Sequence, residues 1–286
     1  MFKLLQIISA FPSEKQFVVM SALSDLFKET REEKRAALIG YMPAGFPSVA
    51  GSIEMINAMV DGGVDLVEVG YPYSDPVMDG PVIQRATELA LDGGFKANDL
   101  FDVVSKVNAP TVVMTYWNPI ERYGVENFTH KLLQSKGVGV ITPDLTIEES
   151  EGWIDVTSKM GVDRIYVVAP STTEDRLKKV LPKCSGFVYA ASLMGVTGTR
   201  SSLAGSAREL VTRIKSHTSL PVCVGLGVSN AEQARDVASF ADGVIVGSAF
   251  ISLVQSCIRD GVFDEKEATA KVRVLAEELA SAVGKK

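Results

Sequence analysis

The chain has 286 residues, of which 46% are hydrophobic, and a formal net charge of −6. This acidic balance argues against a nucleic-acid-binding face, which needs clustered Lys and Arg. No apolar run approaches the roughly 18 residues of a membrane-spanning helix. The cysteines, Cys184, Cys223 and Cys257, are dispersed and lack metal-site spacing. Their odd number and scatter indicate a reducing compartment, which we expect to be the cytoplasm.

The N-terminal residues 1–19 precede a second methionine, Met20, which opens the sequence MSALSDLFKET. Their short apolar stretch lacks the small-residue cleavage site of a signal peptide. We therefore expect residues 1–19 to be an extension outside the fold, and residues 20–286 to form a single domain. The amphipathic segment 21–33 predicts an extra helix before the first strand, where it would cover the N-terminal mouth of a barrel.

From residue 36 onward, short β-branched segments alternate with amphipathic ones. The strand candidates are rich in Val, Ile or Tyr and too short to be helices. They are residues 36–42, 65–70, 111–117, 138–142, 164–169, 186–192, 221–226 and 243–247. The helical candidates are residues 48–61, 82–92, 125–136, 147–160, 173–183, 205–217, 230–240, 249–259 and 264–283.

This alternation predicts an α/β fold. Gly63, Gly137 and Gly161 each end a helical stretch before a strand, where a left-handed residue is favoured. Strands that are apolar along most of their length predict a parallel sheet covered by helices, and eight of them close a single (β/α)8 TIM barrel. The rival is an open doubly wound sheet, but no GxGxxG follows the first strand.

A carboxylate lies inside the second predicted strand. Glu68 is flanked by Val67 and Val69, and alternation places it on one face with Leu66 and Gly70. A buried carboxylate is costly unless it is hydrogen-bonded or used. Burial would also raise its pKa toward the range that an acid/base catalyst needs near pH 7. A structural ion pair is the alternative interpretation.

The loop after this strand contains two further carboxylates, Asp75 and Asp79, among three prolines and Gly80. Loop aspartates usually form turns, so each alone indicates little. The carboxyl ends of barrel strands carry the active site, however, and this stiff loop would lie over the end that bears Glu68. Two carboxylates in different environments can divide the acid and base roles.

Glycines follow or end the last three predicted strands, at Gly195, Gly198, Gly225, Gly227 and Gly247. Their backbone N–H groups could approach an anion, and a helix that begins at Ser248 would aim its N-terminus at the same point. Many barrels bind phosphate there. Tight turns are the alternative for any single glycine.

Several residue types are missing where other chemistries would need them. No lysine lies in a predicted strand, so Schiff-base aldol cleavage has no candidate nucleophile. His130 and His217 fall in predicted helices, and no Asp/His cluster has metal-ligand spacing, so we expect no metal site. Carbon–carbon cleavage would then rest on carboxylate catalysis of a substrate that itself takes up electrons.

The segment EVGYPYSDPVMDGP at 68–81 resembles the signature of the tryptophan synthase α subunit family. The similarity extends from about residue 36 to residue 250, and the supporting segments are MTYWNP at 114–119, ITPDL at 141–145, YAASLMGVTG at 189–198, VGLGV and GVIVGSA. The resemblance implies a TIM-barrel lyase of tryptophan biosynthesis. Its reaction would be the retro-aldol cleavage of indole-3-glycerol phosphate to indole and glyceraldehyde 3-phosphate.

The resemblance also implies roles for single residues. Glu68 matches the catalytic glutamate, which is thought to protonate indole C3 and to accept the proton of the glycerol hydroxyl. Asp79 matches the catalytic aspartate, which is understood to bind the indole N–H and stabilise the indolenine tautomer. Tyr189 matches the active-site tyrosine of the sixth strand, beside the ring. Thr197 lies in the loop that closes over the substrate and contacts Asp79.

Two sets of binding positions are carried over in the same way. The family's phosphate contacts fall on Gly198, Gly227, Gly247 and Ser248. The walls of the indole pocket fall on Tyr41, Ile83, Tyr116, Leu226 and Ile245. Many members differ at four places. They have Phe at Leu226, Thr at Pro43, an Arg-containing loop at 193–194, and a Pro after the aspartate that Asp144 matches, where Thr146 lies nearby in this sequence. These departures bear on ring packing and loop closure.

The family works as an αββα heterotetramer in which indole passes to a β subunit that holds pyridoxal phosphate. The resemblance implies that Pro72 and Asp75 contact this β subunit and that the present chain holds no cofactor.

Other enzymes on the same barrel, a phosphosugar isomerase or a thiamine phosphate synthase, are the rival class. The isomerase would need an Asp or Cys pair at the ends of strands one and five. Those ends read GYMPAG and VVAPS, which contain neither residue. A non-catalytic or purely allosteric indole-phosphate-binding subunit is the non-enzyme alternative, against which the intact Glu68 and Asp79 argue.

Overall fold

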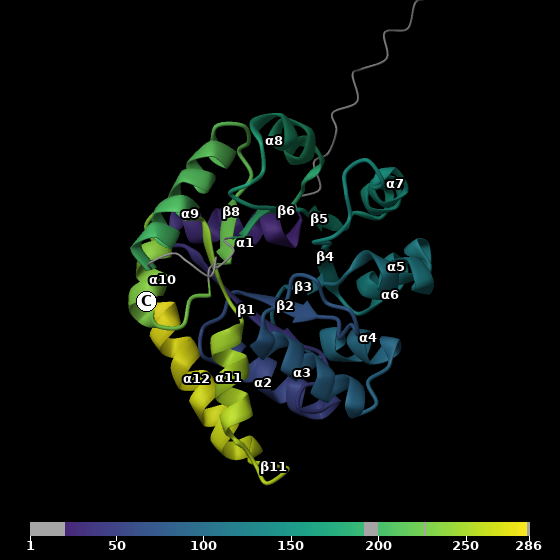
Figure 1. Ribbon diagram of the computed structural model, residues 1–286, viewed down its shortest axis with the longest axis vertical. Coiled ribbons are helices and arrows are strands. Elements are labelled where there is room, and N and C mark those ends of the chain that lie inside the picture. The colour runs from purple at the N-terminus through teal and green to yellow at the C-terminus, as the bar shows by residue number, and fades with distance from the viewer. Residues whose placement is uncertain (1–20, 192–199, 226, 285–286) are drawn as a thin grey trace, which may run out of the picture.

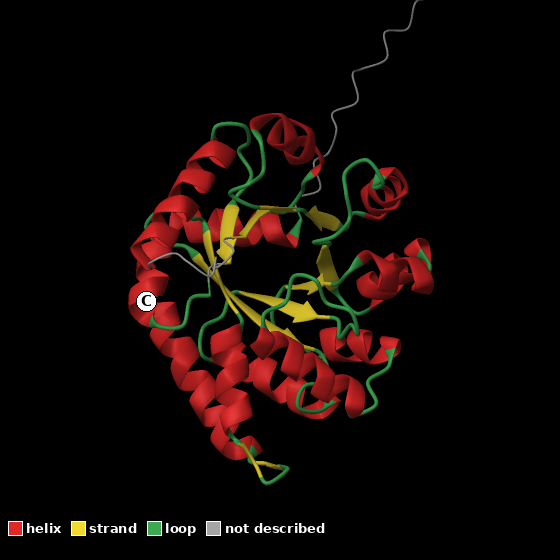
Figure 2. Cartoon of the chain, in the orientation of Figure 1, coloured by secondary structure: helices red, strands yellow, loops and turns green. Residues whose placement is uncertain are grey.

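In a computed structural model, which describes residues 21–191, 200–225 and 227–284, parallel strands form a ring enclosed by helices (Figures 1 and 2). The described strands of the ring run in the order β5-β4-β3-β2-β1-β9-β8-β7-β6. β5 and β6 are two pieces of one segment separated by Tyr166, and they pair with β4 and β7 respectively. The ring thus corresponds to eight chain segments, which confirms the predicted (β/α)8 barrel.

The strands lie close to their predicted positions because each is a short segment that contains Val, Ile or Tyr, the residue types favoured in strands. Their bounds are β1 (Ala37–Pro43), β2 (Leu66–Gly70), β3 (Thr111–Met114), β4 (Gly137–Ile141), β5 (Asp163–Ile165), β6 (Val167–Val168), β7 (Val188–Ala191), β8 (Val222–Gly225) and β9 (Gly243–Val246). The prediction of a strand over 111–117 was too long. β3 ends at Met114, and Tyr116 is the N-cap of a short helix.

Helices cover the outside of the ring (Figure 2). They are α1 (Ala22–Glu32), α2 (Val49–Asp61), α3 (Pro81–Asp92), α4 (Ala97–Ser105), α5 (Trp117–Tyr123), α6 (Val125–Gln134), α7 (Glu151–Met160), α8 (Glu174–Val180), α9 (Arg200–Lys215), α10 (Ala231–Ala238), α11 (Ser248–Ser256) and α12 (Glu265–Ala282). The sequence did not predict α4 and α5, which are short. It also missed the hairpin of β10 (Ile258–Arg259) and β11 (Val262–Phe263), which follows α11.

The extra N-terminal helix is confirmed. The N-cap of α1 is Ser21, whose side chain accepts a hydrogen bond from the Ser24 N–H. The apolar face of α1 packs into the lower part of the barrel, where Phe27 meets Phe187 with ring centroids 5.9 Å apart. α1 therefore covers the N-terminal mouth of the ring, behind the strands in the view of Figure 1.

The interior of the barrel is layered. Ile39 and Leu66 belong to an apolar cluster that α1 closes from below. Since side chains alternate along a strand, the inward residues one step further toward the C-terminal ends are Tyr41 and Glu68. A polar layer thus stands directly on an apolar one.

The predicted helix-ending glycines are right at two of three positions. Gly63 and Gly161 have positive φ angles of 107° and 71°. Gly137 instead lies in β4, and Lys136 takes the left-handed conformation with a φ of 68°. A β-carbon at position 137 would lie 2.2 Å from Cδ1 of Leu132, so this glycine is needed for close packing rather than for its φ angle.

Candidate active site

A cavity of about 650 Å³ opens at the C-terminal ends of the strands. It brings together predicted residues from β1, β2, β7, β9 and the loops beside them. The polar and glycine positions that line it are Glu68, Asp79, Tyr189, Gly227, Gly247 and Ser248. The predicted indole-pocket residues that line it are Tyr41, Ile83 and Ile245. Thr197, Gly198 and Leu226 lie outside the described residues.

Glu68 is buried on the inner face of β2, with 1% of its surface exposed. Its Oε2 atom has no hydrogen-bond partner among the described residues, and within them Glu68 forms no salt bridge. Burial, together with the negative charge of Asp79, raises its pKa to about 8. The alternative of a structural ion pair is therefore unsupported among the described residues, and the raised pKa favours the protonated form of Glu68 at neutral pH.

Asp79 lies in the loop between β2 and α3, above Glu68. Burial raises the pKa of Asp79, and a hydrogen bond with Tyr116 opposes the increase. The Gln84 amide donates to the Asp79 carbonyl over 2.8 Å. α3 begins one residue after Gly80 because Pro81 suits the first position of a helix. The start of this helix therefore holds the backbone of Asp79.

Tyr116, which follows β3, supports the same loop. Its hydroxyl accepts the Met78 N–H over 2.9 Å, and its ring packs on Tyr73 with centroids 5.2 Å apart. Burial is the main cause that raises the Tyr116 pKa to about 12. The Asp144 carboxylate accepts the N–H of Trp117 over 2.9 and 3.1 Å, which fixes the chain next to Tyr116. The predicted pocket residue Tyr116 thus contacts the loop, and it is not among the residues that line the cavity.

Sequence reasoning missed the supporting roles of Gln84 and Asp144. Gln84 had no local signal, because its partner is a backbone carbonyl of the preceding loop. Asp144 stands after the end of β4 in ITPDL, and a polar residue at a strand end was the signal that could have found it. Gln84 holds the loop that carries Asp79 directly, and Asp144 holds it through the segment that bears Tyr116.

Glycines at the strand ends make room for two tyrosines. A β-carbon at Gly70 would lie 2.4 Å from the hydroxyl oxygen of Tyr41, and one at Gly225 would lie 2.4 Å from that of Tyr189. At Gly247 a β-carbon would lie 2.9 Å from Cδ1 of Tyr41. Real β-carbons do not approach other atoms so closely. Gly225 and Gly247 therefore serve packing as well as any approach to an anion.

The start of α11 faces the cavity from the end of β9. Gly247 is its N-cap without a side-chain hydrogen bond, and Ser248 is its first residue. The first N–H groups of a helix lack intrahelical partners and attract anions. Gly227, with a φ of 65°, lines the same cavity. This end of the cavity has the chemistry of a phosphate site.

The histidines lie elsewhere. His217 contacts Glu174 over 2.7 Å on the outside of the barrel, and His130 is exposed on α6. In the described part of the chain no group of three His, Cys, Asp or Glu residues could hold a metal ion. No helix of that part is long and apolar enough to cross a membrane.

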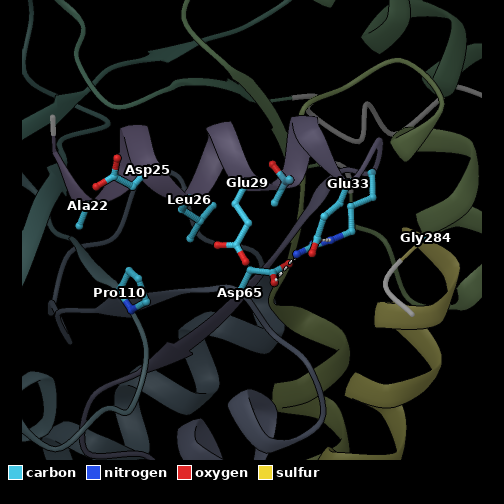
Figure 3. Close-up of a pocket in the computed structure, with 10 residues that line it drawn as sticks. Ala22, Asp25, Leu26, Glu29, Glu33, Asp65, Pro110 and Gly284 are labelled. Carbon is cyan, nitrogen blue, oxygen red and sulfur yellow. Dashed lines mark hydrogen bonds and ion pairs between the residues drawn. The ribbon is translucent and has the colours of Figure 1, made fainter.

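A second cavity, of about 610 Å³, lies at the N-terminal ends of the strands under α1 (Figure 3). Figure 3 shows Glu29 and Asp65 on its walls. Arg35 pairs with Asp65 over 2.7 Å and with Glu33 over 2.5 Å. These paired charges satisfy one another at the opposite end of the barrel from Glu68. We therefore place the candidate site in the first cavity.

The fold and the position of that cavity define an enzyme of the (β/α)8-barrel class. The family model described as "Tryptophan synthase alpha chain" matches residues 27–284. The tryptophan synthase alpha chain of Streptomyces avermitilis is 53% identical over 265 residues, which cover 91% of this chain and 94% of the relative. That of Thermobifida fusca is 52% identical over 270 residues, with 92% and 98% covered.

Solved structures agree. Tryptophan synthase from M. tuberculosis in its aminoacrylate-bound form matches with a TM-score of 0.82 and 43% identity, over 92% of this chain and 99% of that one. The tryptophan synthase a2b2 complex of Pyrococcus furiosus matches with a TM-score of 0.79 and 33% identity, over 86% and 98%. The chain belongs to the tryptophan synthase alpha chain family. This confirms the predicted family and its lyase role in tryptophan biosynthesis, and it excludes the rival barrel enzymes.

Proposed function

We propose that the cavity cleaves indole-3-glycerol phosphate to indole and glyceraldehyde 3-phosphate, with Glu68 and Asp79 as its catalytic carboxylates. The observation that carries the proposal is the buried Glu68, whose Oε2 has no partner among the described residues and whose pKa burial raises to about 8. Membership of the family indicates which substrate is cleaved, and the cavity has residues that can contact each part of that substrate.

Glu68 acts first as an acid and then as a base. Its proton passes to indole C3, which turns the ring into a cation that can take up electrons. The carboxylate then accepts the proton of the glycerol hydroxyl on the carbon attached to C3. The bond between that carbon and C3 breaks, its electron pair returns to the ring, and the carbon becomes the aldehyde. Glu68 is left protonated, as it began.

Asp79 acts through its charge. It is the more exposed of the two carboxylates and ionises first, because the nearly complete burial of Glu68 favours the neutral acid there. An ionised Asp79 can accept the indole N–H and stabilise the positive charge that develops when C3 is protonated. The two groups differ in environment, and they therefore divide the roles.

The remaining positions complete the site. Tyr189 would lie beside the indole ring, with Tyr41, Ile83 and Ile245 on the walls of the cavity. The phosphate would bind at Gly227, Gly247 and Ser248, where the N-terminus of α11 opens. Leu226, Gly198 and Thr197 keep the pocket, phosphate and loop-closure roles that the resemblance implies. Tyr116 acts through the Asp79 loop.

The phosphate position has a direct test. In Ser248→Asp, a negative charge at the start of α11 should weaken the binding of glycerol phosphate at least tenfold by titration. The matched control Ser252→Asp adds the same charge to an exposed position further along this helix and should bind normally. Equal affinities in both variants would move the phosphate elsewhere.

A β subunit is the proposed partner, since one solved relative is an a2b2 complex. Asp75 is exposed near Val77 and Met78, which are 76% and 39% exposed. An exposed apolar pair on a loop next to the site suits a protein interface. Pro72 is buried within this chain, so it would shape the loop rather than reach the partner.

We propose that the chain itself binds no cofactor, the pyridoxal phosphate belonging to the partner. We also propose that it works in the cytoplasm. Cys184, Cys223 and Cys257 are free and buried, which suits a reducing compartment.

The decisive experiment is indole release by Glu68→Gln and Asp79→Asn. Both variants keep the shape of the side chain, but the first amide cannot transfer a proton and the second cannot supply a negative charge. We expect the rate to fall about 10³-fold, within the range for general acid/base groups, while glycerol phosphate still binds. Retention of more than about a tenth of the wild-type rate, a loss under roughly 1.4 kcal/mol, would remove that residue from the mechanism.

A further inference from the structure

The ring of Tyr41 bridges the ends of two strands that flank β1. Its Cδ1 side faces β9, where a β-carbon at Gly247 would lie 2.9 Å away. Its hydroxyl end faces β2, where a β-carbon at Gly70 would lie 2.4 Å from Oη. The ring therefore spans the cavity wall between the phosphate end and the carboxylate end. Its hydroxyl lies on the carboxylate side.

This hydroxyl is placed close to the two catalytic carboxylates. Tyr41 is the register partner of Glu68, and both residues line the cavity with Asp79. Tyr41 is only 7% exposed, and its hydroxyl forms no hydrogen bond with another described residue. The hydroxyl oxygen is not among the fully buried atoms that lack a partner, and Tyr41 lines the cavity, so its hydroxyl is open to an acceptor there.

We propose that the Tyr41 hydroxyl is a positioning group that, once substrate is bound, donates a hydrogen bond to the ionised Asp79 carboxylate and holds it in the cavity beside Glu68. The inference rests on the proposed function and adds a third polar residue to its machinery. Asp79 is the acceptor because it ionises before Glu68, and an ionised carboxylate accepts a stronger hydrogen bond than a neutral acid.

The charges around the Tyr41 hydroxyl agree with Tyr41 as the donor of this hydrogen bond and Asp79 as its acceptor. Burial and the negative charges of Asp79 and Glu68 raise the pKa of Tyr41 well above its usual value. The other titratable groups that face the hydroxyl are Tyr116, which follows β3, and Tyr189 from β7, whose pKa values are also raised. All three phenols keep their protons through the working range, so Tyr41 remains a donor throughout.

The test is Tyr41→Phe, which removes one oxygen and keeps the ring between Gly70 and Gly247. A lost donor makes the ionised Asp79 less stable, so its pKa rises. We expect kcat to fall about tenfold, KM to stay within about twofold, and the acid limb of the kcat profile, which reports the enzyme–substrate complex, to move up by about one pH unit. Carboxylate ¹³C NMR of the protein with glycerol phosphate bound should show the same upward shift in the pKa of Asp79.

Tyr71→Phe is the matched control. It removes the same atom one residue after β2, where the ring packs edge-on against Phe95 outside the cavity, and its profile should be unchanged. A Tyr41→Phe profile identical to wild type, with an unmoved Asp79 resonance, overturns the proposal. A wild-type protein that releases no indole would refute the proposed function instead, and the NMR titration would still decide the hydrogen bond.

Discussion

The side chain of Tyr41 fills the space that a side chain at Gly70 would need, because a β-carbon at position 70 would lie 2.4 Å from the Tyr41 hydroxyl oxygen. Gly70 is the last residue of β2, two positions beyond Glu68. The charges of Asp79 and Glu68, the two carboxylates that we propose as catalytic, both act on this hydroxyl. The absence of a side chain at position 70 therefore lets a phenol enter the polar layer of the barrel.

This relationship predicts strong coupling between the two positions. Gly70→Ala should destabilise the protein by about 1–3 kcal/mol, since its methyl group cannot fit beside the ring. In a Tyr41→Ala background the methyl group has room, so most of this loss should disappear. Urea unfolding of the two single variants and the double variant measures the coupling. Additive losses would show that the ring moves aside at no cost.

The pH dependence of cleavage follows from the two carboxylates. The proposed mechanism needs protonated Glu68 and ionised Asp79. kcat/KM should therefore rise as Asp79 ionises and fall as the pH passes about 8, where Glu68 loses its proton. The measurement is indole release from about pH 5 to about pH 10. A rate that stays level to the alkaline end of this range would contradict the role of Glu68 as the acid that begins the reaction.

Glu68 should also reduce stability in alkaline solution. Its pKa is raised from 4.5 to about 8 in the folded protein, so ionisation favours unfolding as the pH rises between these values. Glu68→Gln should match wild type near pH 4.5 and become more stable, by up to a few kcal/mol, at about pH 8 and above. Denaturant unfolding at about pH 5 and about pH 8.5 compares them.

The exposed Glu88 provides the control, because its side chain is 61% exposed beside Arg85. Glu88→Gln should change stability little at either pH. If the difference in stability between Glu68→Gln and wild type is the same at both pH values, the pKa of Glu68 is not raised in the folded protein.

The β2–α3 loop should couple this chain to its partner. Prolines reduce the conformational freedom that the loop must lose when it becomes ordered. Docking of the β subunit on Asp75 would then favour the loop conformation that holds Asp79 over the indole ring of the substrate. Binding of the β subunit should therefore raise the rate of indole release by this chain. Asp75→Ala should weaken β-subunit association and reduce this activation more than it lowers the rate of the isolated chain. By linkage, a ligand bound in the cavity should tighten β binding by the same factor.

Indole release against added β subunit measures this effect, with the exposed Asp102→Ala on α4 as the control. Equal midpoints and equal activation at saturation for wild type and Asp75→Ala would exclude the loop as the coupling element.

Residues 1–19 should be dispensable. The family match begins at residue 27, and α1 begins at Ala22 with its own cap at Ser21. A chain that starts at Met20 should keep its activity and its melting temperature. A fall in Tm above about 5 °C, roughly 1–2 kcal/mol for a domain of this size, would show that the segment packs on the barrel.

The sequence by itself determined the strands, the ring and the buried acid. β-branched runs separated by helical segments are local signals, and alternation along β2 is enough to place Glu68 inward beside Leu66. The specific spacing from Glu68 to Asp79 was visible in the same stretch. These features depend on neighbours in the chain, so one sequence contains the information.

Only the tertiary structure decided what surrounds these residues. Gly70 is required because of Tyr41 on the adjacent strand, and Tyr116 supports Met78 from beyond the end of β3. Gly137 serves the packing of Leu132, while Lys136 takes the left-handed turn. Each of these relationships depends on interatomic distances that must hold to within a few tenths of an ångström, which close packing sets and which no residue pattern records.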